Sequence, residues 1–340
     1  MLLNIFILII SLFLSLIVTS VYIKLAKYYR LTSKPHSGGV RQDIVPTAAG
    51  IAFGLLYCLI IITIDQIYVI PTAYKYSILF GGGLIAITGF LDDLYELSGV
   101  LRLCIQFAFI LLISYFFDIH NLISNYERLF IIVYGLPALF FLVWLINTFN
   151  FIDGADGLVS CNSVIFALFG GLYLYLSQEH HLATCLWSLC AINLGFLYFN
   201  WSPAKVFMGD SGSLFLGSIF VIFMLGSTIN NQIPIYTWLI LFSTFYVETT
   251  VVLFVRVWRK RNVFKEHHSL HAYQRQVITS GDHGRPAKIS IIINFFWTVP
   301  LSYLCFLFPI YGLQITAVAL VPLSFIFYFY GPYQVNPRGR

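Results

Sequence analysis

The sequence predicts an all-α integral membrane protein, a polytopic bundle of 10–11 transmembrane helices. Of its 340 residues, 59% are hydrophobic and only 10% are charged, and the mean hydropathy is +0.85. A soluble domain carries roughly 25% charged residues, so too few polar residues are left here to cover a soluble surface. Stretches of about 20 apolar residues, the length that crosses a bilayer, recur along the whole chain.

Eleven such stretches are expected to build a single membrane-embedded domain over residues 1–340. The first lacks a basic segment before its apolar run and is too long for the core of a signal peptide. We therefore expect it to stay as a spanning helix with its N-terminus outside. The eleven stretches lie at about residues 2–22, 46–64, 74–91, 101–117, 129–147, 158–176, 182–199, 213–229, 234–255, 289–308 and 311–330.

The positions of Lys and Arg predict which loops are cytoplasmic, because these residues concentrate on the inner side of a membrane. With the N-terminus outside, 17 of the 19 Lys and Arg fall on the inner side, and only Lys75 and Arg128 fall outside. The net charge of +5 therefore reflects topology and does not indicate nucleic-acid binding. The main cytoplasmic loops are expected at about 23–45, 92–100, 148–157, 200–212 and 256–288.

The third stretch ends in "GFLDDLYELSG" (89–99), with the adjacent carboxylates Asp92 and Asp93. A helix that runs inward presents the negative end of its dipole on that side, and two neighbouring carboxylates repel each other. A cation beside them would relieve both effects. The alternative is an ordinary solvated helix end.

The fifth stretch ends in "NTFNFIDGADGL" (147–158), which places Asn147, Asn150, Asp153 and Asp156 three residues apart. If the helix continues, residues at this spacing are neighbours on one face. The last three side chains would then point into one cleft. The alternative is an Asx-rich turn between two spans.

The eighth stretch opens with "KVFMGDSGSLFLG" (205–217) and starts on the inner side. The free N–H groups and positive dipole of a helix N-terminus form a natural anion site; alternatively, Asp210 or Ser211 is simply the N-cap.

The long inner loop contains "FKEHHSLHAYQRQV" (264–277), with His268 and His271 at helical spacing and Arg275 close behind. This is a compact cationic cluster able to exchange protons. Histidines without cysteine make a weak zinc site, and the alternative is a set of solvated loop histidines.

Three Asp-bearing helix ends and a His/Arg loop thus fall on the same membrane face of a chain with few charges. Oxygen ligands suit Mg2+ far better than zinc. Sites that catalyse phosphoryl transfer combine Mg2+ with groups of this kind, a helix N-terminus and basic side chains. A secondary transporter, the rival class, would carry its carboxylates near the bilayer midplane on broken helices, where only Glu248 is expected here.

These motifs resemble those of the polyprenyl-phosphate N-acetylhexosamine-1-phosphate transferases, the glycosyltransferase 4 type of membrane enzyme. The similar stretches occur in the family's order and cover the inner face of nearly the whole chain. They are "PTAAGIAFG" (46–54), "GFLDDLYELSGVLRLCIQ" (89–106), "NTFNFIDGADGL" (147–158), "VFMGDSGSLFLG" (206–217) and "HHSLHAYQR" (267–275).

The resemblance implies an active site on the cytoplasmic face of the inner (plasma) membrane. It implies Mg2+-dependent transfer of a sugar 1-phosphate, with HexNAc or 6-deoxy-HexNAc as the sugar, from a UDP-sugar to undecaprenyl phosphate or another polyprenyl phosphate. The products are a polyprenyl-diphosphate-sugar and UMP, Mn2+ can substitute for Mg2+, and a homodimer is compatible with the family. This is the first membrane step of a cell-surface polysaccharide such as O-antigen.

Carried over position by position, the resemblance makes Asp210 the principal metal ligand, with Asn150 beside it. Asp92 and Asp93 match the aspartate pair that contacts metal or activates the lipid phosphate. The other residues implied to be catalytic are Asp153, Asp156, His268 and His271. The residues implied to bind substrate are Asn147, Asn150, Arg102, Arg275 and Ser211.

Two departures narrow the resemblance. One large branch has a Lys shortly after its aspartate pair, where this chain reads "DDLYEL"; Arg102 resembles the other branch, which disfavours a muropeptide substrate. The histidine motif reads H-S-L-H, and the "HAYQR" that follows is similar to the subgroup that starts O-antigen or capsular chains. Two routes fit these residues: direct attack of the lipid phosphate on the β-phosphorus, which we favour, and a two-step route through an aspartyl-phosphate.

Overall fold

A computed structural model describes residues 2–33, 44–124, 131–258 and 271–334. Within these four segments every regular element is a helix, and the one β-type pairing is an isolated bridge between Thr32 and Pro46. The all-α fold class predicted from composition is therefore confirmed.

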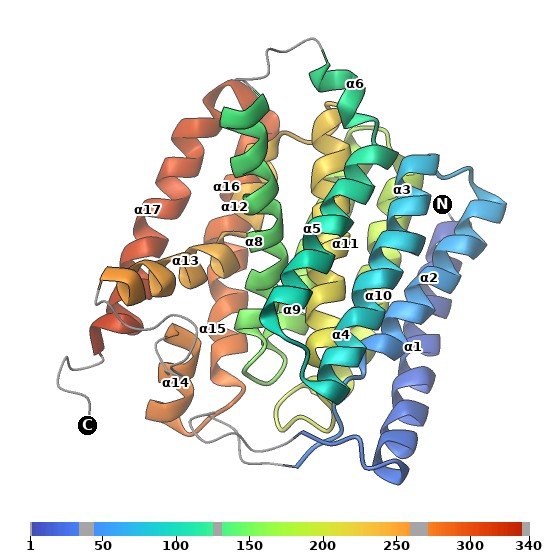
Figure 1. The fold of residues 1–340 in the computed structure, drawn as a ribbon, viewed down its shortest axis with the longest axis vertical. Coiled ribbons are helices and arrows are strands. Elements are labelled where there is room, and N and C mark those ends of the chain that lie inside the picture. Colours follow the sequence, from blue (N-terminus) through green and yellow to red (C-terminus); the bar gives the residue numbers. More distant parts are fainter. Residues whose placement is uncertain (1, 34–43, 125–130, 259–270, 335–340) are drawn as a thin grey trace.

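Ten helices in the described segments are long and apolar enough to cross a membrane. Each coincides with one of the predicted stretches, and Figure 1 shows them side by side in one bundle. They are α1 (Leu2–Tyr28), α2 (Gly50–Ile67), α3–η1–α4 (Thr72–Tyr76, Ser77–Gly82, Gly83–Tyr95), α5 (Gly99–Phe116), η2–α8 (Ile131–Gly135, Leu136–Ile152), α9 (Leu158–Leu176), α10 (His180–Asn200), α11 (Gly209–Ile229), α15–η3–α16 (Arg285–Ile293, Asn294–Thr298, Val299–Leu307) and η4–α17 (Pro309–Tyr311, Gly312–Tyr330).

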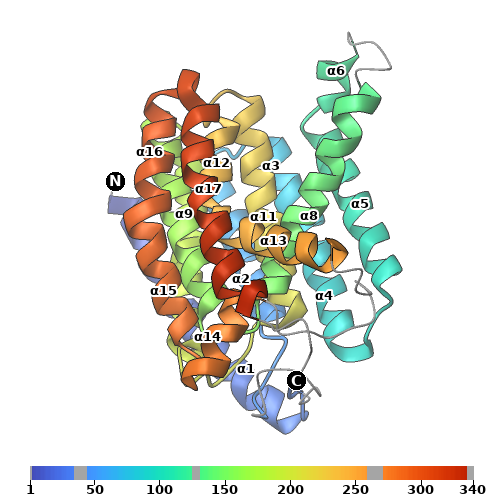
Figure 2. The same ribbon diagram turned by 90° about the vertical axis from the view of Figure 1, so that its left-hand side faces the viewer.

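The expectation of one continuous helix over 234–255 is wrong. The chain there forms α12 (Ile235–Leu241) and α13 (Ser243–Trp258), which are bent by 73° relative to each other. Taken as one span, this pair is the eleventh. Figure 2 shows α13 lying across the bundle, nearly perpendicular to its neighbours. The remaining short elements are α6 (Ile119–Ile123), α14 (Ala272–Ser280) and η5 (Pro332–Gln334).

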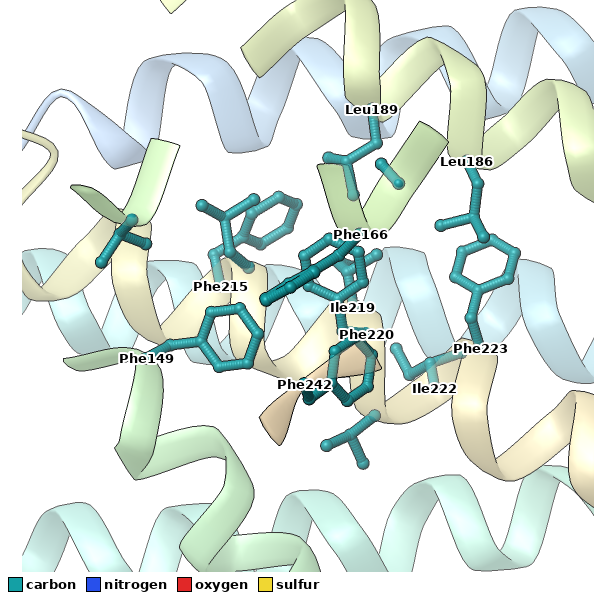
Figure 3. Packing of buried hydrophobic residues seen from close by; sticks show 14 of the residues in the cluster. Phe149, Phe166, Leu186, Leu189, Phe215, Ile219, Phe220, Ile222, Phe223 and Phe242 are labelled. Atoms are coloured by element: carbon teal, nitrogen blue, oxygen red, sulfur yellow. The ribbon is translucent and has the colours of Figure 1, made fainter. Parts of the chain in front are cut away.

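Helix α11 forms the centre of the bundle. Of its most apolar 18-residue stretch, 83% is buried, against 22% for the corresponding stretch of α1. Aromatic rings from α8, α9 and α11 interlock around it (Figure 3). Phe149 stacks on Phe220 with ring centroids 5.5 Å apart, and Phe166 packs edge-on against both. Such pairs add to the stability that comes from burying their area, so this core fixes α11 relative to its neighbours.

The first turn of α11 is approached closely by two glycines on other helices. A Cβ atom at Gly89 of α4 would lie 2.5 Å from the backbone oxygen of Asp210, and one at Gly50 of α2 would overlap the backbone of Gly212. Only glycine permits such approaches. The C-terminal end of α4 is therefore held directly against the N-terminal end of α11, at what we call the site end of the bundle.

Candidate active site

A guanidinium joins two carboxylates at the site end. Arg102, in the first turn of α5, donates from Nη1 to Asp92 Oδ2 (2.6 Å) and to Asp210 Oδ2 (3.1 Å). The Asp92 side chain is 6% exposed, that of Asp210 30% and that of Arg102 35%. Charged groups this near to a membrane core need partners, and here one cation faces two anions that lie far apart in the sequence.

Asp93 caps α11. Its Oδ1 accepts from the backbone N–H of Asp210 (2.9 Å) and its Oδ2 from that of Ser211 (3.1 Å). Neither Asp210 nor Ser211 is therefore the N-cap. Two N–H groups at this helix end already bind an anion, the side chain of Asp93. We expected this helix end to bind a substrate anion; Asp93 occupies that role, and it thereby fixes the backbone that carries Asp210.

Asn150, from the last turn of α8, donates to Asp210 Oδ1 (2.8 Å) and to Ser213 Oγ (3.2 Å). The structure thus brings Asn150 and Asp210 together, as the resemblance implied. Ser211 is fully buried and its hydroxyl donates to the Met208 carbonyl. In this conformation the Ser211 side chain is buried, and its role in substrate binding stays a prediction.

Asn147 lies one turn further from the site end and pairs with Gln106 of α5. The two amides exchange hydrogen bonds, and Asn147 also donates to the Val143 carbonyl (2.8 Å). Gln106 is only 2% exposed. Our prediction missed Gln106, although it is an amide in an otherwise apolar stretch and follows Arg102 by one helical turn, on the same face of α5. This pair fixes α5 against α8.

The expectation that Asn150, Asp153 and Asp156 share one helical face is wrong, because α8 ends at Ile152. Asp153 follows as the C-cap, and Gly157 then turns the chain with φ +67°. Asp156 is 5% exposed and accepts from the backbone N–H of Ala204 (3.1 Å). It therefore contacts the segment before α11, whereas Asn150 contacts Asp210 and Ser213.

A cavity of about 220 Å³ opens beside Asp156. Its wall also carries Asp282, whose carboxylate accepts from the backbone N–H of Gly284 (2.8 Å) and from Lys288 (3.1 Å). These donors, the Gly284 N–H first, hold the pKa of Asp282 below its usual range. The cavity is lined by Val45, Asp156, Ser202, Pro203, Ala204, Phe207, Gly281, Asp282 and His283.

Helix α14 is tied to the bent helix α13 through Glu248, which is 5% exposed. Glu248 Oε1 accepts from the backbone N–H of Tyr273 (3.2 Å) and lies 3.7 Å from Nδ1 of His271, the N-cap of α14. The Tyr273 hydroxyl reaches the Phe151 carbonyl at the end of α8 (3.1 Å). Glu248 thus accepts a hydrogen bond at the N-terminus of α14, so this carboxylate within a span has a local partner. The feature that most favoured a transporter is thereby explained by local structure.

Arg275 lies half-buried on α14, one turn beyond His271. His268 lies outside the described residues. The common helical face expected for His268 and His271 therefore stays a prediction, and their catalytic roles do too.

The donor set at the site end suits a hard cation. Among the described residues, no three His, Cys, Asp or Glu converge into a complete metal cage. Mg2+ usually binds through only one or two carboxylates, with waters and substrate phosphates filling its other positions. Asp92 and Asp210 turn one oxygen each towards a common positive charge, and Asn150 lies beside them. These residues fit Mg2+.

Comparison with known proteins matches the part of the chain that contains most of these residues. The family model for glycosyl transferase family 4 matches residues 76–228, which include Asp92, Arg102, Asn150 and Asp210. A probable undecaprenyl-phosphate N-acetylglucosaminyl 1-phosphate transferase of Bacillus subtilis (strain 168) is 29% identical over 310 residues, which is 86% of this chain and 82% of the relative.

Two further relatives match over shorter regions. A phospho-N-acetylmuramoyl-pentapeptide-transferase of Streptococcus thermophilus (strain CNRZ 1066) is 30% identical, over 61% of this chain and 65% of the relative. An undecaprenyl-phosphate alpha-N-acetylglucosaminyl 1-phosphate transferase of Escherichia coli (strain K12) is 29% identical, over 62% of this chain and 59% of the relative. The chain spans less than two thirds of the length of these two relatives. With its ten apolar helices and its matched site segment, the chain is a multi-pass membrane protein that belongs to the polyprenyl-phosphate N-acetylhexosamine-1-phosphate transferase superfamily.

Proposed function

We propose that the protein transfers a sugar 1-phosphate from a UDP-sugar to a polyprenyl phosphate such as undecaprenyl phosphate, and releases UMP. The observation that carries the proposal is the meeting of Asp92, Asp210 and Arg102 at the ends of three helices within the matched segment. Both substrates are anions, so the site must offset their repulsion as they approach. Acidic side chains that hold a cation and a basic side chain that faces phosphate oxygens meet that need.

Asp210 would hold Mg2+, with Asn150 and Asp92 beside it; when bound, the metal neutralises phosphate oxygens and orients them. Asp93 positions Asp210 through the N-terminus of α11. Arg102 would contact a phosphate of either substrate. His271 and Arg275, held at the site end by Glu248 and Tyr273, would contribute the proton transfers and the positive charge of the histidine loop.

The uncharged part of the donor, its nucleoside or its sugar, would enter the cavity beside Asp156. The carboxylates of Asp156 and Asp282 line this cavity, and among the described residues that line it there is no Lys or Arg. Carboxylates repel phosphates but accept hydrogen bonds from hydroxyl and N–H groups. The phosphates would therefore lie towards Asp210 and Arg102, while the neutral groups lie in the cavity.

In the route we favour, an oxygen of the lipid phosphate attacks the β-phosphorus of the UDP-sugar. The bond between that phosphorus and the bridging oxygen breaks, and UMP leaves with the oxygen. The alternative passes through an aspartyl-phosphate formed on one of the site carboxylates.

The site end would face the cytoplasm, where UDP-sugars are made. In the sequence, 17 of the 19 Lys and Arg fall in or beside the loops predicted on the same side as Asp92 and Asp210, which the positive-inside rule associates with the cytoplasm. The protein would then lie in the inner (plasma) membrane and begin a cell-surface polysaccharide such as O-antigen, with a homodimer compatible with this arrangement.

The test uses the full chain, purified in detergent, with undecaprenyl phosphate and a panel of UDP-HexNAc and UDP-6-deoxy-HexNAc donors. UMP release and the mass of the lipid product are measured with Mg2+, with Mn2+ and with EDTA. We expect UMP and a lipid heavier by one sugar phosphate from one donor, only with metal. Folded protein that yields UMP without any lipid-linked sugar would contradict the proposal.

A further inference from the structure

Arg102 occupies a place that the proposed chemistry needs for another cation. One atom, Nη1, lies within hydrogen-bond distance of Asp92 Oδ2 and of Asp210 Oδ2. These two residues come from α4 and α11, whose ends are pressed together by the close approach at Gly89. Two carboxylates held this near each other repel, so a positive charge between them stabilises the arrangement.

Both carboxylates are oriented by their remaining oxygens. Asp92 Oδ1 accepts from the Leu97 backbone N–H (2.7 Å), and Asp210 Oδ1 accepts from Asn150 (2.8 Å). Each therefore keeps one oxygen bound to the protein scaffold and turns the other towards Arg102. A divalent cation ligated by both residues would use those same two oxygens.

The guanidinium of Arg102 is not hydrogen-bonded to any backbone group of the described residues. Its side chain is 35% exposed, and among the described residues the hydrogen bonds of its guanidinium all go to these two carboxylates. Asp93 behaves differently, because both of its oxygens accept from N–H groups of α11. Releasing Asp93 would uncover the end of that helix.

We propose that Arg102 is an internal counter-ion that holds the divalent-cation position in the resting enzyme and is displaced when the cation binds. The freed guanidinium then faces the phosphates that arrive with the metal. This inference rests on the proposed function, since it requires Asp210 to be the metal ligand. Because the cation and Arg102 compete for the same oxygens, binding of either one must weaken the other by the same factor.

The test measures Mn2+ binding without substrates, by EPR of free Mn2+, on the full chain in detergent. Arg102→Gln removes the charge and keeps a hydrogen-bond donor, and Arg102→Lys keeps the charge. Lys75→Gln is the matched control, because it removes one positive charge from an ion pair with Asp65 (3.0 Å) at the opposite end of the bundle.

We expect Arg102→Gln to bind Mn2+ more tightly than the natural chain, by about 5-fold or more, the lower limit of typical coupling between two sites. Arg102→Lys should fall between them, and Lys75→Gln should match the natural chain. Unchanged or weaker binding in folded Arg102→Gln and Arg102→Lys would overturn the inference. Asp210→Asn separates the two proposals: if it binds Mn2+ as well as the natural chain does, the metal assignment itself fails.

Discussion

Asp93 was expected to be catalytic, but the structure gives it a positioning role that can be tested. Asp93→Ala removes the acceptor of two backbone N–H groups at the start of α11. Loss of a helix cap costs about 0.5–2 kcal/mol, and a hydrogen bond to a charged group contributes about 1.5–3 kcal/mol. Ser211 is fully buried in the natural chain, so its N–H has no solvent contact that could offset the lost acceptor before the site rearranges.

We therefore expect Asp93→Ala to lower the free energy of unfolding by about 0.5–3 kcal/mol, the range that the cap and hydrogen-bond values span. For a chain of 340 residues this corresponds to a fall of about 1–4 °C in the unfolding midpoint. Asp93→Asn keeps one acceptor oxygen, so its midpoint should fall by roughly half as much.

The assay measures the unfolding midpoint, the Mn2+ dissociation constant and the turnover of both variants in detergent. If Asp93 positions Asp210, metal affinity and turnover should decline together, and more in the Ala variant. If Asp93 acts only as a base, turnover should collapse in both variants while the midpoint and the metal affinity stay unchanged. That second pattern would refute our reasoning.

Three further substitutions probe the supports of the site. Gly89→Ala should destabilise the protein by about 1–3 kcal/mol and weaken Mn2+ binding, because the added methyl meets the α11 backbone. Gly83→Ala on the same helix is the control, since its methyl meets nothing within 4 Å. Equal unfolding midpoints of the two variants would contradict the close approach. Glu248→Ala should speed hydrogen exchange in α14, since it leaves the Tyr273 N–H without its acceptor. Glu248→Gln should change the exchange rate less. Equal exchange in both variants and the natural chain would show that Glu248 does not hold α14. Asp156→Ala should raise the KM for the nucleotide sugar more than that for the lipid, and the reverse order would place the donor elsewhere.

Most of the fold was predictable because hydropathy alone reports a spanning helix. It could not report the break at Phe242, which contains neither Pro nor Gly and continues the apolar pattern across the bend. The bend turns α13 across the bundle, and Glu248 thereby reaches the start of α14. That consequence depends on tertiary packing, so the sequence predicted Glu248 only as an isolated carboxylate within a span.

The candidate site was predictable in its members and less so in their arrangement. The adjacency of Asn150 and Asp210 was implied by the resemblance and is present. The capping of α11 by Asp93 was not foreseen, because it depends on two helix ends that are more than 100 residues apart in the chain. The sequence did not predict that Asn150 and Asp156 contact different neighbours. That prediction assumed a helix that continues through Gly154 and Gly157, where the chain turns instead.

The central claim is that the carboxylates at the meeting of α4 and α11 carry the phosphotransfer chemistry. Turnover of Asp210→Asn, measured as lipid-linked sugar formed per enzyme, tests it most directly. Asp65→Asn is the control, since it makes the same substitution in an ion-paired aspartate at the opposite end of the bundle. We predict that Asp210→Asn abolishes product at an unchanged unfolding midpoint while Asp65→Asn retains turnover. Substantial product from folded Asp210→Asn would contradict the account.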